Sequence, residues 1–193
     1  MNRLRSARLK LNPEKCRLFQ LKTNFLGHDA SGRRIEPHPE KVKAVVEWPT
    51  PRNLTEARGF VALASYYRRF VASFAEITRP IHLLTQKNQP FVWTDSQQTA
   101  FGSLKHCLVT APVLSLACDD GRYVLDSDAS DGALGLVLQH EQDVLLKVIV
   151  YASRALQPAE RSLLYESEGT LGSHLWIKAF STVLVGPTIR LPN

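Results

Sequence analysis

The pattern of hydrophobic and polar positions changes twice along the chain. Over residues 16–36, short β-prone runs and a Ser31-Gly32 turn predict a small antiparallel hairpin. Hydrophobic residues then recur at helical spacing, which predicts a helical unit. Further on, apolar runs separated by short turns predict a second sheet. We therefore expect an α+β protein divided into residues 1–36, 37–117 and 118–193.

The middle unit is predicted to hold a series of helices. A short helix at 40–48 is opened by Pro37 and Pro39 and ended by the prolines that follow it. Asn53 and Glu56 have the spacing of a capping box at the start of a longer helix. Its hydrophobic face comprises Phe60, Leu63, Ala64, Tyr67, Phe70, Val71 and Phe74. Further helices are expected at 77–84 and from Thr94, with Gln97 as its capping partner, to about residue 109.

The second sheet is predicted as an antiparallel meander of three strands, at 123–128, 134–139 and 146–151. A helical stretch over 158–185 and a short fourth strand at 188–190 should follow. Asp126 and Asp128 share one face of the first strand, because side chains alternate along a strand. Two carboxylates beside a turn can hold a divalent cation, although an ordinary strand end has the same pattern.

Composition excludes several classes of protein. The chain has 193 residues, of which 44% are hydrophobic, as in a globular protein. No apolar run is long enough to span a membrane, so we expect no membrane partner. Cys16, Cys107 and Cys118 lie far apart, which argues against a disulfide framework or a zinc site. This cysteine pattern favours a reducing compartment, so an intracellular location in the cytoplasm or nucleus is expected.

The net charge of +6 is concentrated in the first half of the chain and fits a nucleic-acid partner. Arg68 and Arg69 lie beside Tyr67 on the longer predicted helix. Arginine beside tyrosine can contact a phosphate backbone. A core aromatic stripe with a solvated basic face gives the same pattern, so both interpretations remain open at this point.

Several motifs, all in the correct order, resemble the C-terminal half of the reverse transcriptase of Ty3/gypsy-type retrotransposons. Phe25-Leu26-Gly27-His28 is similar to the primer-grip hairpin of that family. The run from Leu63 to Phe70, LASYYRRF, resembles its thumb. Asp126-Ser127-Asp128-Ala129-Ser130 resembles the opening strand of its RNase H domain. The resemblance implies the end of a palm with a primer-grip-like hairpin, a helical thumb and connection, and a partial RNase H-like domain of meander plus helix.

The resemblance also implies a partner. The hairpin would lie against a primer strand, and the thumb arginines would contact phosphates. The expected partner is an RNA–DNA hybrid or duplex, bound without sequence preference and with strong salt dependence. The residues expected to contact it are Phe25, Leu26, Gly27, His28, Tyr67, Arg68 and Arg69.

The implied catalytic machinery is incomplete. RNase H chemistry needs several carboxylates around two Mg²⁺ ions. Asp128 matches the first of them, as catalytic residue and metal ligand, whereas the position of the helical glutamate is Gly169. Glu168 stands one residue earlier, on a different side of a helix. We expect the remaining carboxylates beyond Asn193 and the polymerase aspartates before Met1. The chain alone is therefore predicted to be inactive and not to bind Mg²⁺ stably.

Three alternatives remain to this picture of a nucleic-acid-binding fragment. The chain is a hybrid endonuclease if Glu168 replaces the missing glutamate and a partner, such as the rest of the polymerase, completes the site. It is an interaction module if the RNase H-like fold serves only to pack against another chain. It is a degenerate retroelement copy if it has no selected function.

Overall fold

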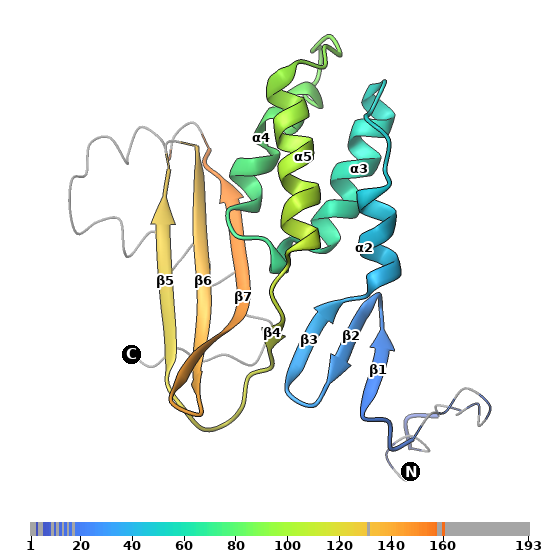
Figure 1. The fold of residues 1–193 in the computed structure, drawn as a ribbon, viewed down its shortest axis with the longest axis vertical. Coiled ribbons are helices and arrows are strands. Elements are labelled where there is room, and N and C mark those ends of the chain that lie inside the picture. The colour runs from blue at the N-terminus through green and yellow to red at the C-terminus, as the bar shows by residue number, and fades with distance from the viewer. Residues whose placement is uncertain are drawn as a thin grey trace.

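A computed structural model describes residues 3, 6–8, 10, 12, 14, 16, 18–130, 132–157 and 160. It confirms the predicted α+β class, with two antiparallel sheets and a set of helices (Figure 1). The expected helix over 158–185, the strand at 188–190 and Glu168 fall outside these residues, apart from Glu160. No helix in the described part of the chain is both long and apolar enough to cross a membrane. The division at residues 36 and 117 stays a prediction.

The first sheet has the strand order β1-β2-β3-β4. Its strands are β1 (Lys22–Phe25), β2 (His28–Ser31), β3 (Arg34–Pro37) and β4 (Leu114–Ser115). The hairpin predicted over 16–36 is thus a three-stranded meander. Strand β4 was not predicted, and it joins β3 through the pairs Arg34 with Ser115 and Ile35 with Leu114. The chain therefore returns to its first sheet after the helical unit.

The helical unit consists of α2 (Pro39–Val46), α3 (Leu54–Tyr66), the 3-10 turn η2 (Arg68–Phe70), α4 (Phe74–Leu84) and α5 (Asp95–Val109). Both predicted helix starts are confirmed. The side chain of Asn53 accepts the backbone N–H of Glu56 at 2.9 Å. The N–H of Thr94 donates to Oε1 of Gln97 at 3.0 Å. Each bond satisfies a backbone or side-chain group at a helix end that would otherwise lack a partner.

The prediction of one longer helix from Asn53 through Phe74 is wrong. It ends at Tyr66, the chain passes through η2, and α4 starts only after Ser73, whose φ of 51° is left-handed. The hydrophobic pattern hides this break because Tyr67, Phe70 and Phe74 on both sides of it enter one core. Arg68 and Arg69 therefore lie on a single 3-10 turn and not on the predicted long α-helix.

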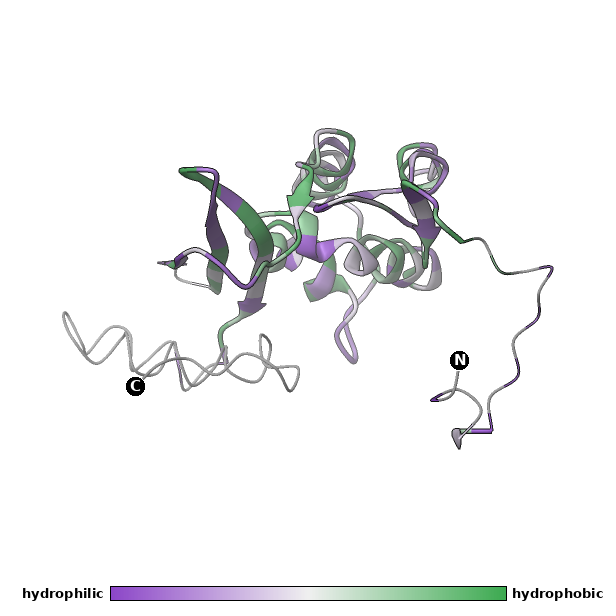
Figure 2. Ribbon diagram, turned by 90° about the horizontal axis from the view of Figure 1, so that it is seen from below, coloured by the Kyte–Doolittle hydropathy of each residue, from purple (hydrophilic) through white to green (hydrophobic). Residues whose placement is uncertain are grey.

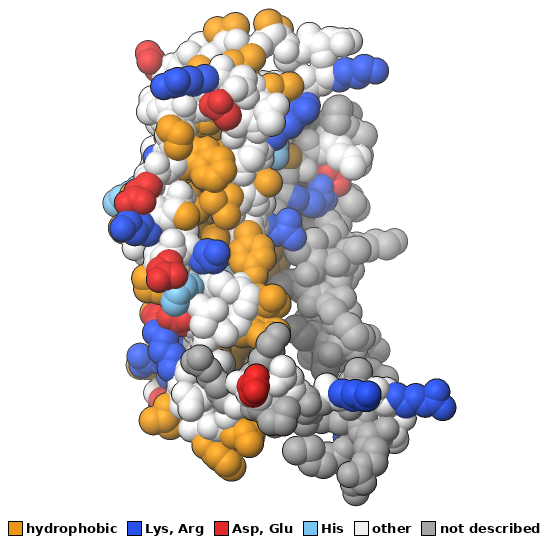
Figure 3. Space-filling view, turned by 90° about the vertical axis from the view of Figure 1, so that its right-hand side faces the viewer, with side chains coloured by type: hydrophobic (Ala, Val, Ile, Leu, Met, Phe, Trp, Pro, Cys, Tyr) orange, Lys and Arg blue, Asp and Glu red, His pale blue; other side chains and the backbone are white. Residues whose placement is uncertain are grey.

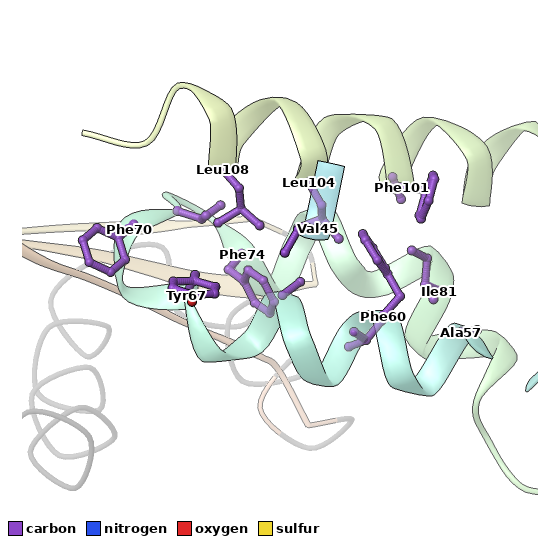
Figure 4. Packing of buried hydrophobic residues seen from close by; sticks show 14 of the residues in the cluster. Val45, Ala57, Phe60, Tyr67, Phe70, Phe74, Ile81, Phe101, Leu104 and Leu108 are labelled. Atoms are coloured by element: carbon purple, nitrogen blue, oxygen red, sulfur yellow. The ribbon is translucent and has the colours of Figure 1, made fainter. Parts of the chain in front are cut away.

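The main core lies between the helices (Figure 4). The rings of Phe60 and Phe101 are 4.4 Å apart and join α3 to α5. Tyr67 and Phe70 belong to the same cluster (Figure 4), and the centroid of each ring lies 5.5 Å from that of His28 in the first sheet. Burial of this many large apolar side chains, each contributing about 1.5–3 kcal/mol, holds the helical unit and the first sheet together.

The second sheet comprises β5 (Tyr123–Ala129), β6 (Ala133–Gln142) and β7 (Leu145–Ala155) in that order. The predicted meander is confirmed, and each strand is longer than expected. These strands are largely hydrophobic, whereas β1–β3 are mostly polar (Figure 2). Ser153 on β7 accepts the N–H of Ala75 at 2.9 Å, which ties this sheet to the start of α4.

Candidate nucleic-acid interface

The tip of the β1–β2 hairpin exposes two large apolar side chains. Leu26 and Gly27 form the two-residue turn, with φ of 51° and 72°. Positive φ at both positions is the geometry of a type I′ hairpin turn. Phe25 and Leu26 are each 67% exposed. A leucine with a left-handed backbone conformation is strained, and such strained residues cluster at functional sites.

Two neighbouring tyrosines at the end of α3 hold this tip in place. The hydroxyl of Tyr66 donates to the carbonyl oxygen of Leu26, and that of Tyr67 donates to the carbonyl oxygen of Gly27 at 3.4 Å. The ring of His28 stacks on Tyr66, with centroids 5.3 Å apart and planes 4° from parallel. These contacts join the hairpin tip to the helix end. We call Phe25–His28, Tyr66 and the exposed Arg68, which follows Tyr66 by two residues, the tip surface.

Tyr67 differs from its expected role. It is 1% exposed, so its ring belongs to the core and has no face free for a nucleic acid. Tyr66 is 48% exposed and is the tyrosine of the pair that the surface presents. Helical spacing contains this information, because Tyr67 follows Phe60 and Ala64 on the buried face and Tyr66 does not.

The two arginines of η2 also differ from each other. Arg68 is exposed, whereas Arg69 is half-buried and its Nε atom has no hydrogen-bond partner within the described part of the chain. Burial, together with the charge of Arg69, lowers the pKa of His28. His28 is therefore neutral at neutral pH and offers an aromatic ring, while Arg68 offers the charge.

The face of the molecule that holds β1, α2 and α3 is shown in Figure 3. Hydrophobic side chains run down this face as a broken band, and Lys and Arg side chains lie along both sides of it, with Asp and Glu side chains among them. Apolar surface flanked by cations suits a ligand with sugars and bases inside and phosphates outside.

A buried carboxylate lies in the second strand pair from the hairpin tip. Asp29 is 6% exposed. Its Oδ1 atom lies 2.8 Å from Nδ1 of His38, and its Oδ2 atom lies 3.0 Å from Nζ of Lys22. Burial acts to raise the pKa of Asp29, but hydrogen bonds from Lys22, His38 and Asn24 outweigh it and hold the pKa below its usual value. This network was not predicted from the sequence.

The predicted catalytic residue lies elsewhere, on the second sheet. Asp128 is exposed on β5, opposite Gly135 of β6. It lines a narrow recess with Ser73 and Glu76 from the start of α4. Asp126 is engaged differently, because its Oδ2 accepts a hydrogen bond from Nε2 of Gln139.

The described residues do not fit a two-metal centre. Among them, no three His, Cys, Asp or Glu side chains are grouped so that they could hold a metal ion. Asp128 and Glu76 are the carboxylates of the recess, whereas two Mg²⁺ ions need several converging oxygen ligands. Glu168 lies outside the described residues, so its role stays a prediction.

Comparisons with known sequences agree with this fold. The family described as RNase H-like domain found in reverse transcriptase matches residues 93–191. The retrovirus-related Pol polyprotein from transposon 412 of Drosophila melanogaster is 38% identical over 156 residues, which cover 81% of this chain and 13% of that protein. The transposon Tf2-3 polyprotein of Schizosaccharomyces pombe is 32% identical, over 80% of this chain and 12% of that protein. The chain thus spans about an eighth of these relatives.

Solved structures show the same fold. A foamy viral protease-reverse transcriptase in complex with dsDNA superimposes with a TM-score of 0.66 at 21% identity, over 86% of this chain and 33% of that one. The same kind of protein in complex with an RNA/DNA hybrid gives a TM-score of 0.67 at 20% identity, over 92% and 25%.

Proposed function

Because this chain belongs to the family of RNase H-like domains found in reverse transcriptases, we propose that it binds an RNA–DNA hybrid or duplex through the tip surface. Its curated relatives are Pol polyproteins of retrotransposons, as the resemblance predicted. The observation that carries the proposal is that Phe25 and Leu26 are exposed at a turn whose Leu26 and Gly27 carbonyl groups are held by two tyrosine hydroxyls. The structural neighbours bound to dsDNA and to a hybrid support it.

The proposed contacts divide by chemistry. Phe25, Leu26 and the ring of Tyr66 offer apolar surface to sugars and base edges. Arg68 offers a charge to one backbone phosphate, which displaces a condensed counterion. Such contacts fix the position of a strand without reading its sequence. The buried network around Asp29 keeps the hairpin from bending when a strand presses on its tip.

We further propose that the chain on its own does not cleave the hybrid. The argument is the small number of carboxylates around Asp128 among the described residues. Divalent metal chemistry is a property of the RNase H-like family, and a complete site would need ligands from other residues or another chain. In the endonuclease alternative, Glu168 replaces the missing glutamate and a partner chain supplies the remaining ligands.

Binding of a 5′-labelled hybrid of roughly two helical turns, followed by fluorescence anisotropy between 50 and 200 mM NaCl, tests the proposal. The dissociation constant should rise steeply with salt. Arg68→Gln should weaken binding about fivefold or more and reduce the slope of log K against log[salt] by about one. Phe25→Ser should weaken binding with little change in slope, because it removes no charge.

The matched control is Arg52→Gln. Arg52 is also exposed, but it stands just before α3, at the end of the helix opposite to Tyr66. The Arg52→Gln variant should bind the hybrid with an affinity within about twofold of the wild type. Equal behaviour of the Arg52 and Arg68 variants would place the interface elsewhere. A folded chain without salt-dependent binding would rule out the function itself.

A further inference from the structure

A second basic feature lies at the other end of the first sheet. A recess of about 330 Å³ opens between the β2–β3 turn, strand β4 and the β6–β7 hairpin. Strand β2 runs from His28 at the tip surface to Ser31 at this turn, so the recess and the tip surface are separated by the length of the strand. Its polar lining consists of Arg33, Arg34, Ser115, Gln142 and Lys147.

The recess has an excess of positive charge. Arg33 and Arg34 form no salt bridge with any residue that the structure describes. Lys147 pairs with the exposed Asp143, with Nζ and Oδ2 2.9 Å apart. One carboxylate thus faces three cations. The charge of Arg33 also acts on Asp143, but cations in excess on a concave wall focus a positive potential, which favours an anion.

These cations stand on a fixed frame. The carbonyl oxygen of Arg33 accepts the N–H of Leu116 at 2.8 Å, and Arg34 pairs with Ser115 in the β3–β4 ladder. Nε2 of Gln142 donates to the carbonyl oxygen of Leu116 at 2.8 Å and so links β6 to the same segment. The backbone positions are therefore held before any ligand arrives, which lowers the entropy cost of binding.

The recess also contains an unused hydrogen-bond donor. Ser115 is 8% exposed, and among the described residues its hydroxyl has no hydrogen-bond partner. The Oγ atom of Ser115 is not one of the described side-chain atoms that are both buried and unpartnered, so it opens onto the recess and can donate to a ligand there. A hydroxyl beside two guanidinium groups and an ammonium matches the oxygens of a phosphate, which accept both point charges and forked donors.

We infer that this recess binds a phosphate group through Arg33, Arg34, Lys147 and Ser115. The inference goes beyond the proposed function, since it concerns a different site. Two sources supply the same chemistry: a backbone phosphate of a bound nucleic acid, or a small phosphate compound. Occupation by the backbone would extend the nucleic-acid footprint from the tip surface along the first sheet to its junction with the second.

The test uses three variants of the full chain. Arg34→Gln/Lys147→Gln removes two charges from the recess, and Arg52→Gln/Lys87→Gln removes one Arg and one Lys charge from exposed positions outside it. Ser115→Ala removes the hydroxyl without changing the charge. Inorganic pyrophosphate is titrated by calorimetry, and the salt slope of hybrid binding is measured in parallel. Thermal melting of each variant establishes that it is folded.

We expect pyrophosphate affinity to fall about tenfold or more in Arg34→Gln/Lys147→Gln and severalfold in Ser115→Ala, with the control unchanged. If the recess variants lose pyrophosphate binding but keep the salt slope of hybrid binding, the ligand of the recess is a small phosphate compound. A slope lower than that of the control by about one per lost contact identifies the backbone. The inference is overturned if recess and control variants behave alike in both measurements. The pyrophosphate titration stands even if the wild-type chain binds no hybrid, so the two proposals fail separately.

Discussion

The hydroxyl of Tyr67 donates a hydrogen bond to the carbonyl oxygen of Gly27 across 3.4 Å, although the two residues are 40 positions apart. A buried side chain of the helical core thus supports the turn of a polar hairpin. The approach is close: a Cβ atom added to Gly27 would lie 3.0 Å from the Tyr67 oxygen, and the φ of Gly27 is +72°. Both facts require glycine at this turn.

Gly27→Ala should therefore destabilise the chain by roughly 1–3 kcal/mol, because alanine meets both the tyrosine hydroxyl and an unfavourable φ. Urea denaturation measures the change. The control is Gly102→Ala in α5, where an added Cβ meets nothing within 4 Å. It should raise stability by about 0.5–1 kcal/mol, since alanine favours a helix. Equal shifts of the two midpoints would contradict the close contact at Gly27.

Leu26→Asn should raise stability and lower hybrid affinity. Asparagine tolerates the left-handed backbone at this position better than leucine, so we expect a gain of about 0.5–1 kcal/mol. The loss of an exposed apolar side chain should weaken hybrid binding severalfold. Val144→Asn is the control, because Val144 has a φ of 64° and is 91% exposed in the β6–β7 turn.

The Val144 variant should gain stability in the same way and bind the hybrid as the wild type does. If Leu26→Asn keeps full affinity, the hairpin tip is not a contact surface. Denaturant midpoints and anisotropy titrations on the same preparations give both quantities.

Acid should weaken the hairpin through Asp29. The folded-state pKa of Asp29 lies below its ordinary value of 3.8. Its contribution to stability is therefore complete above the unfolded pKa and is lost as the pH falls through the folded pKa. Asp29→Asn should lower stability at pH 7 by about 1–3 kcal/mol, because His38 and Lys22 lose a charged partner.

The same variant should flatten the fall in stability below about pH 4 relative to the wild type. Denaturant midpoints at several pH values between 3 and 7 measure this difference. Parallel pH profiles for the two proteins would show that the Asp29 network does not contribute as described.

Incubation of the chain with a labelled hybrid and Mg²⁺ or Mn²⁺ should give no cleavage products on a gel. Asp128 and Glu76 are the carboxylates of the recess on β5, and the described residues bring no third ligand to them. Cleavage that disappears in Asp128→Asn would overturn this prediction. The effect of Glu168→Gln would then show whether that glutamate completes the site, with Asp119→Asn as a control for general loss of charge.

Local signals in the sequence predicted the elements that local physics controls. The caps at Asn53 and Thr94 satisfy backbone groups within three residues, so spacing alone located both helix starts. The meander β5–β7 followed from apolar runs separated by short turns. The same periodicity failed between Tyr66 and Phe74, because a core accepts hydrophobic side chains from a helix and from a turn alike.

The sequence by itself determined the family, the α+β class and the positions of the polar hairpin and the apolar meander. Only the tertiary structure decided that the helix from Asn53 ends at Tyr66, that β4 joins β3, and that Arg33 and Lys147 share a recess. These relationships join residues far apart in the chain. Their free energy comes from packing between distant elements, which no window of neighbouring residues contains.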